Sequence, residues 1–198
     1  MSTLKVNNLK NVDGTRTLAS DSGTAWSWGS NVPAGTVVNV QSTTITTALD
    51  LGSVASGGEV QVTGLTVAIT PKTTSSKMLL MYNVMASKTA HGGMSILILK
   101  RDSTAIGVAT GLNTNQLAAT NAFDQYSNTS AEQDQNTAVA SGTFLDSPST
   151  TSEITYKVFL GNTSSSSRTI YVNRGLVNST NVYNSRGTST LTVMEVAG

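Results

Sequence analysis

The chain has 198 residues and a formal net charge of +1, so it can bury a sizeable core but has no basic field that would attract nucleic acid or an anionic membrane. Charged residues make up only 12% of the chain, and Ser, Thr and Asn together make up roughly 37%, yet an apolar share of 38% predicts a folded protein. Cysteine is absent, which excludes disulfides and thiolate metal sites, and the single histidine leaves too few ligands for a zinc or iron site.

The first 35 residues are polar and carry only short apolar pieces, so we expect a short extended N-terminal arm over residues 1–35. Trp26 and Trp28 lie two residues apart, which puts both indoles on one side of an extended segment. Their rings either pack on the protein's own body or dock the arm onto a partner. The N-terminus lacks the apolar region of a signal peptide and no apolar run is long enough for a membrane span, so we expect folding in a cytoplasm without membrane insertion.

From Thr36 onward the pattern is β throughout, and we predict a head domain over residues 36–198. Apolar and polar residues alternate in short runs rich in Val, Ile and Thr, and no segment keeps a 3.6-residue period. The predicted strands are residues 36–41, 43–49, 60–62, 65–69, 77–86, 95–99, 105–109, 138–145, 154–160, 169–173 and 189–197. So many short strands between turn signals predict an all-β fold, a β-sandwich of the jelly-roll type.

Three local patterns lead to sharper predictions. The alternation changes phase across Gly64, which predicts a bulge or turn there. The strands at 77–86 and 95–99 are apolar on both faces, which is typical of central strands that are covered on both sides. Residues 89–93 between them have the composition of a hairpin-like connection, and residues 111–136 form a long polar stretch.

No set of residues has the pattern of an active site. His91 is the only histidine, and it precedes two glycines with no carboxylate within ten residues, so we expect a structural or solvated side chain. Asp124, Glu132 and Asp134 surround one polar loop without the spacing of a calcium site, so we expect solvated carboxylates there. The sequence therefore predicts no enzymatic activity, no cofactor and no metal.

Several phrases are distributed over both ends and most of the body of the chain. They are residues 1–6, 33–38, 69–79, 100–106, 144–148, 155–158 and 189–196. Together these phrases resemble small virion proteins of marine bacteriophages, especially cyanophage-like tail-fibre and related surface proteins.

The resemblance implies a non-enzymatic structural protein of the virion, assembled in the host cytoplasm and released by lysis. Residues 1–35 would then attach a homotrimer to other virion proteins, with Trp26 and Trp28 as candidates for virion docking. We predict from it a tail-fibre or adhesin-like subunit that attaches to a glycan or protein of the host surface. The alternative is a capsid decoration or head-fibre protein that is anchored to the capsid by its arm.

The candidates for receptor contact lie in two loops of the predicted head. Phe123 and Tyr126 belong to the long polar stretch, and Tyr183 and Arg186 belong to a loop before the last strand. Loops on a rigid scaffold commonly carry binding residues, and aromatic and Arg side chains dominate binding hot spots. Ordinary packing or a contact at the rim of an interface is the alternative interpretation of each residue.

Overall fold

The computed structural model describes residues 8–10, 17–21, 26–28, 32–89, 93–123, 136–182 and 184–198. All regular structure in these residues is β, which confirms the predicted all-β class. No helix among them could cross a membrane.

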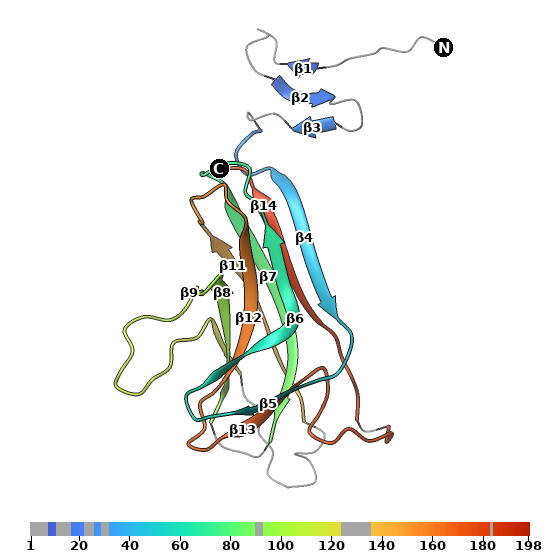
Figure 1. Cartoon of the computed structure of the whole chain (residues 1–198), viewed down its shortest axis with the longest axis vertical. Helices are drawn as coiled ribbons and strands as arrows, with labels where there is room; N and C mark the ends of the chain where they lie inside the picture. Colours follow the sequence, from blue (N-terminus) through green and yellow to red (C-terminus); the bar gives the residue numbers. More distant parts are fainter. Residues whose placement is uncertain are drawn as a thin grey trace.

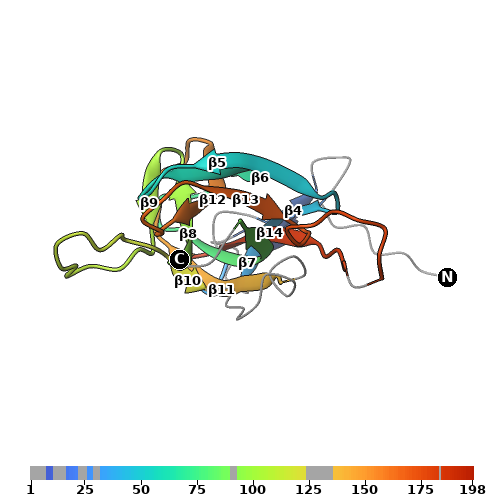
Figure 2. The same ribbon diagram turned by 90° about the horizontal axis from the view of Figure 1, so that it is seen from below.

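The head is a sandwich of two antiparallel sheets (Figure 1, Figure 2). The first sheet contains β4 (Val37–Ile45), β14 (Ser189–Val196), β7 (Lys77–Lys88), β13 (Arg168–Val172), β5 (Leu49–Val54) and β11 (Ala138–Asp146). The second sheet contains β10 (Asn121–Phe123), β8 (Ser95–Arg101), β12 (Ile154–Asn162), β6 (Glu59–Ile69) and β9 (Thr104–Ile106). Both sheets direct alternate side chains into one shared core.

The strand order is that of a jelly roll. In the first sheet the neighbours run β4–β14–β7–β11, and in the second sheet they run β6–β12–β8–β10. Among these eight strands, those that follow one another along the chain lie in different sheets except for β8 and β10, as in the two interleaved Greek keys of a jelly roll. The predicted jelly-roll sandwich is confirmed.

Alternation in the sequence accounts for the core. Along β14 buried and half-buried residues alternate strictly, and Leu191 and Val193 are completely buried. They meet Leu65 and Leu160 of the second sheet within one apolar cluster. Each such side chain contributes about 1.5–3 kcal/mol when it is fully buried.

The predicted irregularity at Gly64 is confirmed. In β6 the buried residues change from Val62 to Leu65, so the inward-facing phase shifts by one residue. The pairing register with β12 shifts at the same place, and Gly64 has a φ of +82°, which favours glycine. The bulge lets both halves of β6 face the core.

The prediction that two strands are covered on both sides holds for one of them. Leu97 and Leu99 of β8 face the core, and Ile96 and Ile98 on its other face are buried as well. For β7 the prediction is wrong, because Met81 and its neighbours on the outer face are accessible to solvent. The difference arises because a loop of the chain lies over β8.

Some predicted elements differ from those observed. The hairpin between β7 and β8 is wrong, because the jelly-roll winding puts these strands in different sheets. β4 continues through Ser42 as one strand, and β5 and β10 were not predicted at all. β9 ends at Ile106, because Gly107 follows with a φ of +60° close to the Phe144 ring, where a side chain would clash.

The N-terminal strands form a sheet of their own. β1 (Asn8–Lys10), β2 (Thr17–Asp21) and β3 (Trp26–Trp28) pair antiparallel with one another. The backbone at the two tryptophans is extended, as predicted, but their side chains lie outside the described part of the chain. The first and last residues of the head lie side by side. Gly35, just before β4, donates its N–H to the carbonyl of Ala197, just after β14, at 2.7 Å.

A buried polar cluster ties the two sheets together. Asp146 ends β11 of the first sheet, and its carboxylate accepts hydrogen bonds from Arg101 of β8 at 2.7 and 2.8 Å. The hydroxyl of Tyr156, in β12, donates to the same carboxylate at 2.7 Å, and its side chain is completely buried. These charge-assisted bonds satisfy the buried Asp146 carboxylate and the buried Tyr156 hydroxyl.

This cluster leads to a prediction for alkaline pH. Burial, and then the hydrogen bond to Asp146, raise the pKa of Tyr156 above its ordinary value. Above about pH 10 an unfolded tyrosine releases its proton while folded Tyr156 retains it, so stability should fall with pH by up to about 1.4 kcal/mol per pH unit. Urea unfolding between neutral pH and pH 11 should show this fall in the wild type and a flatter profile in Tyr156→Phe. Parallel profiles would contradict the assignment to Tyr156.

Candidate functional site

The loop of residues 107–120, between β9 and β10, projects from the side of the head (Figure 1, Figure 2). Its base is held by hydrogen bonds. The Thr120 hydroxyl donates to the Ile106 carbonyl and accepts the Leu99 N–H, both at 3.0 Å. Higher up, Ala109 donates its N–H to the Ala119 carbonyl at 3.1 Å, so the two arms of the loop stay together.

The tip of this loop is a tight turn. Gln116 donates its backbone N–H to the Asn113 carbonyl at 3.1 Å, and its side-chain carbonyl accepts the Asn113 N–H at 2.8 Å. Asn115 within the turn has a φ of +70°, a conformation that asparagine tolerates better than most residues. The exposed Asn115 amide is therefore presented on an ordered turn.

A groove with a volume of about 480 Å³ lies between this loop and the nearby end of the second sheet; we call it the side groove. Its apolar lining includes Met94, Leu112 and Leu117, which are 50%, 42% and 39% exposed. Polar amides and hydroxyls, among them Asn115 and Thr163, lie between them. The groove thus combines apolar contact area with neutral hydrogen-bonding groups.

Leu117 lines both the side groove and a smaller cavity of about 200 Å³. Both spaces are lined by Ile96 of β8, and the smaller one also by Ile98. The loop therefore lies over the outer face of β8, which explains why these two isoleucines are buried outside the core. Glu59 lines the smaller cavity, and its carboxylate is paired with Lys100.

The side of the groove opposite the loop, formed by Met94 and Thr163, is closely packed. Thr163 follows β12, and its hydroxyl donates to the Met94 carbonyl at 2.7 Å. Gly93 has a φ of +70° and packs so closely that a Cβ there would lie 2.6 Å from the backbone nitrogen of Ser164. Only glycine fits such a close approach between two backbones, so the segments around Met94 and Thr163 pack closely together.

The described lining of the side groove is neutral. No charged or titratable side chain is among its described lining residues, so these residues supply neither a general acid nor a general base. The described part of the chain also has no cluster of three residues that could hold a metal ion. Amides and hydroxyls both donate and accept hydrogen bonds, so the groove suits a neutral ligand with hydroxyl groups and apolar faces.

No family model and no curated protein matches this chain. Among solved structures it is similar to a chain in the structure of infectious bursal disease virus, Gt strain, with 10% sequence identity and a TM-score of 0.46. The match covers 90% of this chain and 42% of that chain, so this chain spans less than half the length of its neighbour.

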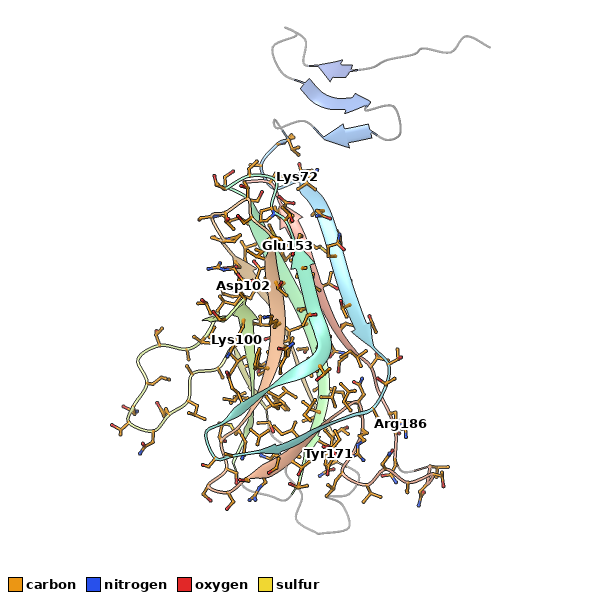
Figure 3. The ribbon with its side chains drawn as sticks, in the orientation of Figure 1. Lys72, Lys100, Asp102, Glu153, Tyr171 and Arg186 are labelled. Atoms are coloured by element: carbon orange, nitrogen blue, oxygen red, sulfur yellow. The ribbon has the colours of Figure 1, made fainter. Side chains whose placement is uncertain are left out.

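The structure separates the predicted receptor-contact residues. Phe123, at the end of β10, is half-buried and packs against the core, although Ala122 beside it lines the side groove. Arg186 lies in the β13–β14 loop, where it donates to the Asn178 side-chain carbonyl at 2.7 Å. That loop projects from the opposite side of the head from the β9–β10 loop (Figure 2, Figure 3).

The other predicted residues fall on parts of the chain that are not described. Tyr126 and Tyr183 lie outside the described residues, so their contact with a receptor stays a prediction. His91 lies outside them too, as does the acidic group around Glu132.

Sequence reasoning did not single out the residues that build the side groove. Met94, Asn115 and Thr163 come from three distant segments, and nothing in the sequence indicates that these segments meet. Leu112 and Leu117 did carry a signal, since isolated leucines in a polar stretch suggest a loop that packs on something.

Proposed function

We propose that this chain is a non-enzymatic surface protein of a virion, a tail-fibre or adhesin-like subunit whose side groove binds a neutral glycan of the host surface. The observation that carries this proposal is the uncharged groove beneath an ordered loop that projects from a rigid jelly roll. Such loops on rigid scaffolds are common carriers of recognition. The sequence phrases that resemble phage tail-fibre and related surface proteins support the virion as its location.

The arm completes the proposal. Residues 1–35 would hold the chain on other virion proteins, with Trp26 and Trp28 at the contact, and the resemblance supports three copies per assembly. The head would fold in the host cytoplasm and reach the outside when the host lyses. No nucleic acid and no membrane insertion is part of the proposed role.

The second candidate function is capsid decoration, and the observation in its favour is that the arm forms a β-sheet apart from the head sheets. In that role the arm would bind capsid subunits and the head would only protrude. Electron cryomicroscopy of the intact particle distinguishes the two roles, because density at the tail supports attachment and density spread over the capsid supports decoration.

Two substitutions in the side groove test glycan binding. Asn115→Gly removes the amide but keeps the left-handed backbone, and Leu112→Ala removes an exposed apolar contact. Each should weaken binding of the full chain to immobilised envelope polysaccharide by about tenfold, which corresponds to the loss of one contact of about 1.4 kcal/mol. Binding is measured by surface plasmon resonance against polysaccharide from host and non-host bacteria.

The matched control is Val37→Ala, at an exposed apolar residue at the start of β4, outside the side groove and outside both loops with predicted receptor contacts. It should bind like the wild type. If the wild type binds no polysaccharide, or if the groove variants bind as well as the control, the side groove is not the attachment site.

A further inference from the structure

The outer face of the first sheet carries an apolar row that crosses four strands. The register places Val40 of β4 beside Met194 of β14, Met194 beside Leu79 of β7, and Leu79 beside Leu145 of β11. Met81 follows on β7 in the next outward row. Val40, Met81 and Leu145 are 50%, 41% and 55% exposed, so this surface, which we call the outer apolar row, is open to solvent.

The surface around the outer apolar row has almost no charge. Thr192 and Thr143 flank Met81 on the neighbouring strands, and the next outward row consists of Thr190, Asn83 and Ser141. On the four strands that the row crosses, β4, β14, β7 and β11, the one charged side chain on this face is Lys77 at its end, and its ammonium donates to the Ser147 hydroxyl at 2.9 Å. Asp50 lies on the same side of the sheet, but on β5 at the far end of β7. A partner of strong charge would therefore find no complement here, whereas a second copy of the same neutral face would meet no repulsion.

The two sheets differ in how their outer faces are treated. On the second sheet the chain lays its own β9–β10 loop over Ile96 and Ile98 and buries both. On the first sheet the apolar outward residues of β7 stay accessible. Central strands that are apolar on both faces are usually covered on both, so β7 has the sequence of a covered strand.

Each long edge of this sheet makes a side-chain hydrogen bond to the second sheet. At one edge the Thr43 hydroxyl of β4 donates to the Thr66 carbonyl of β6 at 2.8 Å. At the other edge the Asn121 amide of β10 donates to the Ser141 carbonyl of β11 at 3.0 Å. The exposed apolar residues lie on the face of the sheet and not along its edges, so a partner would contact them through side chains.

We infer that a second copy of this chain packs on this face, with the outer apolar row at the centre of the contact. Four strands about 4.8 Å apart, each about eight residues long at about 3.3 Å per residue, make a face of roughly 500 Å². Two such faces would bury roughly 1,000 Å² in total, the area that a specific interface needs. The inference rests on this surface alone and holds whether or not the side groove binds a glycan.

Met81→Lys tests the interface, because it puts a charge at the centre of the face. Sedimentation equilibrium of the full chain at micromolar concentration should give a mass above one chain for the wild type and one chain for the variant, with association weakened by about a hundredfold or more. Val182→Lys, a matched change at an exposed valine outside the face, should associate like the wild type. Leu145→Lys on the edge strand serves as a second variant, and circular dichroism checks that each variant is folded.

A second readout uses the absence of cysteine from the sequence. A single Thr192→Cys should react with a maleimide several times more slowly in concentrated than in dilute protein, while Val182→Cys should react equally fast in both. A monomeric wild type overturns the inference. An oligomer that Met81→Lys and Leu145→Lys leave intact, with Thr192→Cys equally reactive at both concentrations, overturns it as well.

Discussion

Replacing Asp146 by alanine is expected to lower the free energy of unfolding by about 3–5 kcal/mol, because removal of one partner from a buried ion pair leaves the other groups unsatisfied. Asp146 is only 6% exposed and accepts from both the Arg101 guanidinium and the Tyr156 hydroxyl. Without the carboxylate, the completely buried Tyr156 hydroxyl loses its acceptor. Urea unfolding followed by circular dichroism at neutral pH measures the loss.

The conservative variant separates the charge from the hydrogen bonds. Asp146→Asn keeps one carbonyl oxygen at the site, so it should retain an acceptor for either Tyr156 or Arg101 and lose about half as much stability as Asp146→Ala. Arg101 is a quarter exposed, so water can solvate part of its charge in both variants. A loss below about 1 kcal/mol for Asp146→Ala would mean that this cluster does not hold the two sheets together.

The strands with clear alternation could be predicted, because burial on one face imposes a two-residue period on the sequence. β14 follows the predicted strand within a residue at its C-terminal end, and β11 and β12 each extend only slightly beyond theirs. The bulge at Gly64 could be predicted for the same reason, since only a change of phase keeps Val62 and Leu65 both inside.

Elements without that period could not be predicted. β10 has only three residues, Asn121–Phe123, and it is a strand because it pairs with β8, not because of its own pattern. β4 continues through Ser42 because its pairing with β14 is continuous there, with Ser42 opposite Thr192. Such long-range pairing outweighs local propensity and leaves little trace in the sequence.

The candidate site was the hardest part to predict. The side groove brings together Ser56, Met94, Leu117 and Thr163 from four separate segments, and no pattern in the sequence links them. The apolar outer face of β7 did indicate that something covers it, because apolar residues on one face of a strand usually indicate that this face is buried. The pattern does not indicate whether the residues that pack on this face belong to the same chain or to another copy.

In a chain so rich in Asn, Ser and Thr, the sequence could not predict which asparagines are buried. Asn162 is completely buried, and its amide donates to the Val54 and Ser166 carbonyls at 3.0 and 2.9 Å. In sequence it resembles the exposed Asn178. Only its position at the end of β12, where three backbone segments converge, gives it a structural role.

Asn173 is also a buried asparagine that binds several backbone groups. Replacing it by alanine should lower the free energy of unfolding by about 4 kcal/mol. Its amide donates to the carbonyls of Ile45 and Thr47 at 2.9 and 3.0 Å, and its side-chain oxygen accepts from the Ser189 hydroxyl at 2.6 Å. Asn173 is completely buried, so alanine leaves these partners without water to replace the amide. Alanine must also adopt the φ of +61° that Asn173 has, and this backbone strain accounts for about 1 kcal/mol of the loss.

Asn173→Gly divides this loss into its two parts. Glycine adopts the left-handed conformation without strain but still lacks the amide, so this variant should be about 1 kcal/mol more stable than Asn173→Ala in urea unfolding. Equal stability of the two would contradict a backbone contribution. Asn173→Asp should be at least as damaging as alanine at neutral pH, because a carboxylate would face the Ile45 and Thr47 carbonyls, which also accept hydrogen bonds. This junction, where β13 and β5 take over from β14 and β4 beside β7, requires one side chain that donates twice and accepts once, and asparagine meets that requirement.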